Sequence, residues 1–141
     1  MLFGGGFQIG AGQDIGLRRG RRRDLLTFRF NHQQRRSNGD HVPDIACDFV
    51  LVSHGHEDHI GDALSIAKRN DAVIVANYEL AEYFTAKGAR THGMNPGGAH
   101  VFPFGKVKLT LAHHSSSVEA GLNAVYLGTP CGILLQAGGK T

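Results

Sequence analysis

The amino-acid sequence predicts an α/β fold, in which helices cover a sheet. Two short apolar runs of strand length, residues 47–53 and 72–76, are each followed by a segment with helical spacing of its apolar side chains. Residues 101–114 and 131–139 predict further strands with no helix between them. Alternating strands and helices followed by antiparallel strands are typical of layered α/β domains.

Two helices are predicted in the first half of this pattern. Residues 59–69 place their apolar side chains near one helical stripe: Ile60, Ala63, Leu64, Ile66 and Ala67. Residues 77–87 predict a second helix, with Leu80, Ala81 and Phe84 on one side. The local order is therefore strand, helix, strand, helix.

The second half predicts strands and loops. Residues 89–100 predict a loop, because they contain Pro96 and a Gly-Gly pair. Strand-like residues on both sides of Gly105 predict a hairpin. Residues 115–130 predict mostly connecting chain, and residues 131–139 predict a final strand.

Length and composition exclude several classes of protein. The chain has 141 residues, of which 41% are hydrophobic and 19% are charged, and this is typical of one globular domain rather than a disordered tail. No apolar run approaches the ~18 residues that span a membrane, so we expect no membrane partner. The first residues do not resemble a signal peptide. Two cysteines exclude a disulfide-rich scaffold, and a reducing cytoplasm is the expected location.

The formal net charge of +3 is unevenly distributed. Residues 1–46 contain eight arginines and four aspartates, whereas residues 47–141 contain seven basic and eight acidic side chains. No sustained period of 2 or 3.6 is present between Leu17 and Asp40, so we expect an atypical, basic, poorly ordered segment over residues 1–46. The recognisable domain is then 47–141. No aromatic platform accompanies the arginines, which argues against a nucleic-acid partner.

A histidine-rich motif directly follows the first apolar strand. His54 and His56 are two residues apart, so in extended chain both rings point to the same side. Asp58 and His59 follow where a helix begins, and can approach from another side. Nitrogen and oxygen donors in this pattern suit Zn²⁺, Mn²⁺ or Fe²⁺. The alternative is an exposed polar loop, or a helix cap formed by Asp58.

Further candidate residues lie downstream. The pair His113–His114 ends a predicted strand, and we expect only one of the two to be a ligand. Ser115 to Ser117 lack the G-x-S-x-G pattern of a nucleophile, so a loop or hydrogen bonds that support the site are favoured. His92 is a candidate pocket residue. The remaining histidines have no supporting context: His32, His41 and His100.

The chain resembles the metallo-β-lactamase superfamily, and within it a group of small, uncharacterised metal-dependent hydrolases. The resemblance covers residues 47–141. It is carried by the motif His-x-His-x-Asp-His together with four longer blocks: DFVLVSHGHEDHIGDALSIAKRNDAVIVANYELAEY, KGARTHGMNPGG, FGKVKLTLAHHSSS and GTPCGILLQAGGKT. The fold it implies is an αβ/βα sandwich, of which this chain carries mainly the first half.

The resemblance also implies a metal site and a reaction. A first metal is implied at His54, His56 and His114, and a second at Asp58 and His59. His92 and Asn95 are implied to line the pocket. The implied reaction is hydrolysis of a small-molecule substrate by a metal-bound hydroxide, with Asp58 orienting the water. Zinc is the expected metal, with two ions in intact relatives and manganese or iron as alternatives.

Some features depart from the family pattern. Family members continue past the last strand into an Ala-Gly-Asp-Thr-like segment, whose aspartate bridges both metals, and then to a further histidine. This sequence ends at Thr141, so we expect C-terminal truncation, reduced metal stoichiometry and impaired activity. The family's N-terminal Gly-His turn is replaced by FGGGFQIGAGQ, and Pro96 stands where an aliphatic residue is usual.

Two other functions remain open at this point. The first is a non-catalytic module in which four ligands close around a structural metal. The second is a nucleic-acid-associated protein, or a nuclease of the same superfamily, that binds phosphates through its arginines.

Overall fold

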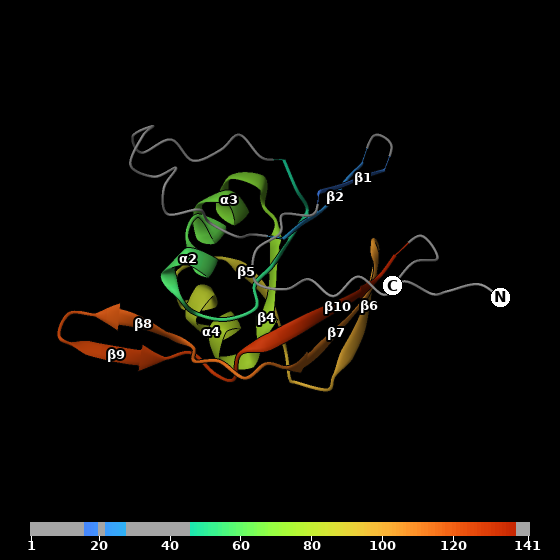
Figure 1. Cartoon of the computed structure of the whole chain (residues 1–141). Coiled ribbons are helices and arrows are strands. Elements are labelled where there is room, and N and C mark those ends of the chain that lie inside the picture. Colours follow the sequence, from blue (N-terminus) through green and yellow to red (C-terminus); the bar gives the residue numbers. More distant parts are fainter. Residues whose placement is uncertain (1–15, 20–21, 28–45, 138–141) are drawn as a thin grey trace.

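The computed structural model describes residues 16–19, 22–27 and 46–137. Its elements, shown in Figure 1, are β1 (Gly16–Arg19), β2 (Arg22–Thr27), β3 (Phe49–Leu51), α2 (Glu57–Ile60), α3 (Ala63–Asn70), β4 (Val73–Asn77), α4 (Tyr78–Ala86), β5 (Arg90–Met94), β6 (Ala99–Phe102), β7 (Gly105–Leu111), β8 (Ser117–Ala120), β9 (Asn123–Tyr126) and β10 (Cys131–Gln136). The predicted α/β class is confirmed.

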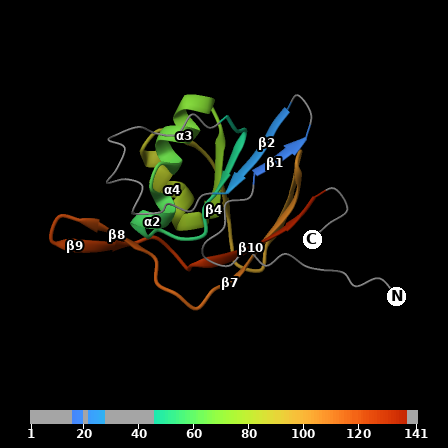
Figure 2. The same ribbon diagram turned by 45° about the horizontal axis from the view of Figure 1, so that its top comes forward.

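The first sheet has the order β1-β2-β3-β4-β5. Strands β2, β3, β4 and β5 run parallel to one another, and β1 is antiparallel to β2. Its central strands are apolar because both faces are covered. Val50 and Ile74 join a core with α3 and α4, whereas the alternate residues Leu51 and Val75 join a core with the second sheet. Figures 1 and 2 show the resulting layers, with helices on one side of this sheet and the second sheet on the other.

The second sheet has the order β10-β7-β6, and both of its pairings are antiparallel. Val107 and Leu109 of β7 point into the core between the sheets, and Ile133 of β10 packs against that core beside them. The alternate residues Lys106 and Lys108 are exposed. The predicted hairpin around Gly105 is confirmed, and so is the predicted final strand over Cys131–Gln136. Residues 138 and 139 of that prediction lie outside the described residues.

The helix predicted over residues 59–69 is divided in two. Helix α2 ends at Ile60 and α3 begins at Ala63, with Gly61 between them at φ 12° and ψ −109°. The predicted apolar stripe still packs inward, because Ala63, Ile66 and Ala67 are buried. The N-cap of α2 is His56, so the alternative in which Asp58 caps this helix is wrong.

Helix α4 starts as the sequence predicts. Asn77 is its N-cap, and the Asn77 side-chain oxygen accepts a hydrogen bond from the Leu80 N–H at 2.8 Å. The apolar side predicted for this helix is buried and consists of Leu80, Ala81 and Phe84.

Part of the basic segment forms strands, which corrects the expectation of a poorly ordered chain at those positions. Residues 16–19 and 22–27 form β1 and β2, and Leu26 of β2 pairs with Val50 of β3. Pairing with a distant strand is invisible to a search for periodicity, which explains the difference. The rest of residues 1–45 lies outside the described residues, and the boundary between 46 and 47 stays a prediction.

Two further expectations were wrong. The predicted loop over residues 89–100 contains β5, which pairs in parallel with β4 along its whole length. The predicted connection over residues 115–130 contains the β8–β9 hairpin, in which Val118 pairs with Val125. Figure 2 shows this hairpin projecting from the two larger sheets. Neither segment is rich in the residues that favour strands, so both strands form through backbone pairing with a neighbouring strand.

No helix in the described part of the chain is long and apolar enough to cross a membrane.

Candidate metal centre

The loop that follows β3 carries the histidine motif and is held by backbone hydrogen bonds on two sides. The Val52 N–H donates to the Val75 carbonyl of β4, and the Cys131 N–H of β10 donates to the Ser53 carbonyl, both at 2.9 Å. The loop then enters α2 at His56. Both sheets therefore determine where the motif lies.

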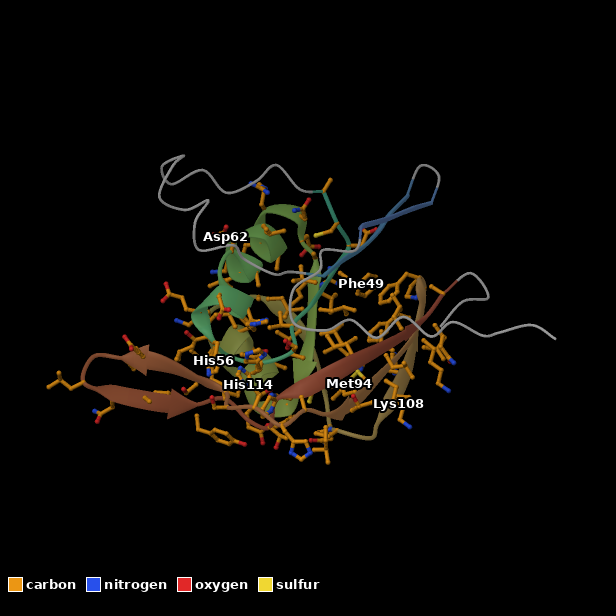
Figure 3. The ribbon with its side chains drawn as sticks, in the orientation of Figure 1. Phe49, His56, Asp62, Met94, Lys108 and His114 are labelled. Carbon is orange, nitrogen blue, oxygen red and sulfur yellow. The ribbon has the colours of Figure 1, made fainter. Side chains whose placement is uncertain are left out.

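Three histidines come together at this loop. The ligand nitrogens of His54, His56 and His114 all lie within 4.8 Å of one another. The ring centroid of His54 is 4.7 Å from that of His56 and 4.7 Å from that of His114, and the last two are 4.8 Å apart. Figure 3 shows His56 and His114 next to each other where the loop after β3 meets the chain that leads to β8. These residues are far apart in sequence, so the tertiary fold assembles the group.

His54 is the most buried of the three, with 5% of its surface exposed. Its Nδ1 lies 2.9 Å from the Ser53 hydroxyl. Its Nε2, by contrast, is a buried atom with no hydrogen-bond partner among the described residues. Buried polar atoms are normally satisfied, so an orphaned nitrogen on a ring that lies beside two other imidazoles fits a metal ligand.

The electrostatics of His54 favour the form that binds metals. Burial lowers its pKa to about 4, and the neighbouring imidazoles of His59, His56 and His114 add to this effect. The carboxylate of Asp58 acts in the opposite direction. At neutral pH the His54 side chain is therefore uncharged, which is the state that coordinates a divalent cation.

Asp58 and His59 lie at the edge of the histidine group. The ring of His59 is 3.9 Å from that of His54, measured between centroids. Its Nε2 is 3.5 Å from a carboxylate oxygen of Asp58, and the Asp58 side chain is 48% exposed. These two residues stand beside the three-histidine group, as a second ligand set requires, and their role as ligands stays a prediction.

His92 and Asn95 have different surroundings. His92 lies in β5, and its ring centroid is 4.3 Å from that of His100 and 5.0 Å from that of Phe102, both in β6. Burial and the nearby His100 lower the pKa of His92. Asn95 is exposed just after β5. The contacts of His92 therefore lie between the edges of the two sheets, and its role and that of Asn95 as pocket residues stay predictions.

The structure separates the two histidines that follow β7. Both are exposed, but the His114 ring belongs to the three-histidine group and the His113 ring does not. Ser115 contacts the group through its hydroxyl, which lies 3.1 Å from His56 Nε2. Of the three consecutive serines, Ser116 is the buried one, with 1% of its surface exposed.

The donor set fits a transition metal. Three imidazoles on one site, one of them buried and uncharged, match the ligands that zinc, manganese and iron accept in proteins. The sequence comparisons agree. A family model described as the β-lactamase superfamily domain matches residues 13–141. The chain belongs to the metallo-β-lactamase superfamily.

Members of this superfamily with similar sequences are named as metal-dependent hydrolases. One from Anoxybacillus flavithermus is 54% identical over 99 residues, which cover 70% of this chain and 44% of that protein. Another from Heliobacterium modesticaldum is 50% identical over 97 residues, covering 69% of this chain and 41% of that protein. The chain thus spans less than half the length of the curated relatives it matches.

A solved structure has the same superfamily fold. Igni18, described as a novel metallo hydrolase from the hyperthermophilic archaeon Ignicoccus hospitalis, superposes with a TM-score of 0.57 and 31% sequence identity. The match covers 79% of this chain and 43% of Igni18. The described fold is therefore a partial metallo-β-lactamase sandwich, as the sequence predicts.

Proposed function

We propose that this chain carries the metal-binding part of a metal-dependent hydrolase, with one zinc ion at His54, His56 and His114. The observation that carries the proposal is the buried, unpartnered Nε2 of His54 beside two further imidazoles. Zinc suits three nitrogen ligands with an open fourth position, and manganese or iron are alternatives. An open position favours catalysis over the rival function of a closed, structural metal site.

The side chains around the ion would have separate tasks. A divalent metal at such a site supplies a Lewis acid and activates a water molecule for attack at neutral pH. Ser53 orients the His54 ring from the side opposite the unpartnered nitrogen. Asp58, half-exposed beside the histidines, is suited to accept a hydrogen bond from the attacking water and to orient it. No protein nucleophile is required.

We propose that Asp58 and His59 hold a second, weaker metal. They supply one carboxylate and one imidazole beside the first site. Two ligands bind a divalent ion more weakly than three, so the first site should fill at lower metal concentration. We accordingly expect lower hydrolytic activity than in a relative with a complete second site.

Metal analysis of the full chain tests the proposal. Protein stripped with a chelator and reloaded with zinc, manganese or iron should retain about one tightly bound ion per chain. Replacing His54 or His114 by Ala should abolish this binding, whereas the exposed neighbour His113→Ala serves as the matched control and should leave it unchanged. If metal analysis finds no transition metal in the wild-type chain after reloading, the proposal is refuted. Hydrolysis of chromogenic esters, amides and phosphodiesters then identifies the bond type.

The substrate and location are also part of the proposal. We propose a small-molecule substrate and a cytoplasmic location, where both buried cysteines would remain the free thiols seen in the structure. The rival nucleic-acid function predicts binding that weakens steeply with salt and disappears when the arginines between residues 17 and 36 are replaced by Gln, a change that leaves β1 and β2 in the chain. Salt-independent or absent binding to nucleic acid supports the small-molecule proposal.

A further inference from the structure

One buried hydroxyl connects the two chain segments that carry the histidines. Ser116 lies two residues after His114, and its Oγ accepts a hydrogen bond at 3.0 Å from the backbone N–H of Gly55, which separates the first two histidines of the motif. The same hydroxyl donates to the Leu127 carbonyl at 3.3 Å. A single side chain thus joins the loop after β3 to the segment after β7.

Leu127 contacts both of the segments that the Ser116 hydroxyl joins. Its N–H donates to the Ser116 carbonyl at 3.0 Å, which closes the base of the β8–β9 hairpin. Its side chain packs on Gly55 so closely that a Cβ at position 55 would lie 2.8 Å from Leu127 Cδ1. Asn77 donates to the Leu127 carbonyl at 3.0 Å and so connects the junction to the start of α4. Gly55 is therefore held between a hydroxyl and an anchored apolar side chain.

The neighbouring Ser115 is placed differently. Its hydroxyl lies 3.1 Å from His56 Nε2, so it competes with any ion that binds through this nitrogen. Within the described part of the chain, Ser116 hydrogen-bonds backbone groups alone, in a site where it is 1% exposed. Its hydrogen bonds to Gly55 and Leu127 therefore occupy no imidazole nitrogen of the site.

We propose that Ser116 is a positioning residue, which holds the loop of His54 and His56 at the right separation from His114 before a metal binds. The inference rests on the proposed function, because it concerns the same metal site. Without the hydroxyl, the buried Gly55 N–H would lack an acceptor and the loop would have to shift. Residues that support metal ligands in this way typically change metal affinity by about 10- to 100-fold.

Three variants of the full chain test the proposal: Ser116→Ala, Ser116→Thr and, as the matched control, Ser117→Ala. Zinc affinity is measured by competition with a chromogenic chelator, and ligand geometry by the visible spectrum of bound cobalt(II). Ser116→Ala should lose about 10- to 100-fold in affinity and change the cobalt spectrum. Ser116→Thr keeps a hydroxyl and should restore both, and Ser117→Ala should behave as the wild type.

Other outcomes overturn the inference. Wild-type affinity in Ser116→Ala, or an equal loss in the control Ser117→Ala, would show that the Ser116 hydroxyl is not responsible. Amide hydrogen exchange of Gly55 in the metal-free wild type needs no variant, and exchange as fast as that of an exposed loop overturns the inference by itself. A wild-type chain that binds no zinc overturns the proposed function, whereas zinc binding that Ser116→Ala leaves unchanged overturns this inference alone.

Discussion

Gly55→Ala perturbs the closest packing contact behind the metal site. The new Cβ would lie 2.8 Å from Leu127 Cδ1 and 3.0 Å from Leu127 Cβ, well inside the ordinary carbon–carbon separation of about 3.5–4.0 Å. Leu127 is 3% exposed, so its side chain has no solvent into which to move. Overpacking of this kind costs about 1–3 kcal/mol, and we expect Gly55→Ala to lower the free energy of unfolding by that amount.

Urea denaturation of the metal-free chain measures this cost. Gly93→Ala is the control, because its new Cβ would meet no atom closer than 3.3 Å, and its effect should be smaller. Leu127→Ala alone should cost about 2–5 kcal/mol through the cavity that it creates. The double variant should cost less than the sum of the two single variants, because Leu127→Ala removes the atom nearest to the new Cβ. A cost below about 0.5 kcal/mol for Gly55→Ala, with additive behaviour in the double variant, would refute the reasoning.

Three further predictions concern the surroundings of the site. Asn77→Ala removes the N-cap of α4 and the donor to two carbonyls, so it should lower the free energy of unfolding by about 2 kcal/mol or more in the same denaturation assay. A cost below about 0.5 kcal/mol would contradict this. Burial lowers the pKa of His54 from 6.5 to about 4, so the unfolded chain binds more protons between these values. The stability of the metal-free chain should therefore fall as the pH drops through this window, and His54→Gln should flatten that dependence in a pH series of melting curves. Burial, assisted by Glu79, raises the pKa of Cys131 to about 11, so a thiol reagent at pH 8 should label it only after unfolding, and rapid labelling of the folded chain would contradict this.

The elements that were predicted correctly have patterns that are complete within a few residues. The apolar runs of β3 and β4 reflect burial on both faces, and the stripe of α3 reflects burial on one side. The closeness of the His54 and His56 rings is local in the same way, because both residues belong to one short loop.

The elements that were missed depend on partners elsewhere in the chain. Strand β5 contains Arg90 and Gly93 and has no strand-like alternation, but it pairs with β4 over five residues. The β8–β9 hairpin turns at Gly121, which has a positive φ of 65°, and its side chains are largely exposed. Backbone hydrogen bonds between neighbouring strands stabilise both elements, and the residue types of one segment do not show which other segment it pairs with.

The sequence by itself therefore determined the α/β class, and it predicted a metal site, since imidazole and carboxylate donors at this spacing suit a divalent metal. Only the tertiary structure decided which side chains complete the site. It brings His114, rather than its neighbour His113, to the motif, and it buries Ser116 against Gly55. Both outcomes depend on how β7 and the chain after it pack against the loop that follows β3. Contacts between segments about 60 residues apart are set by the packing of whole layers, and no local pattern records them.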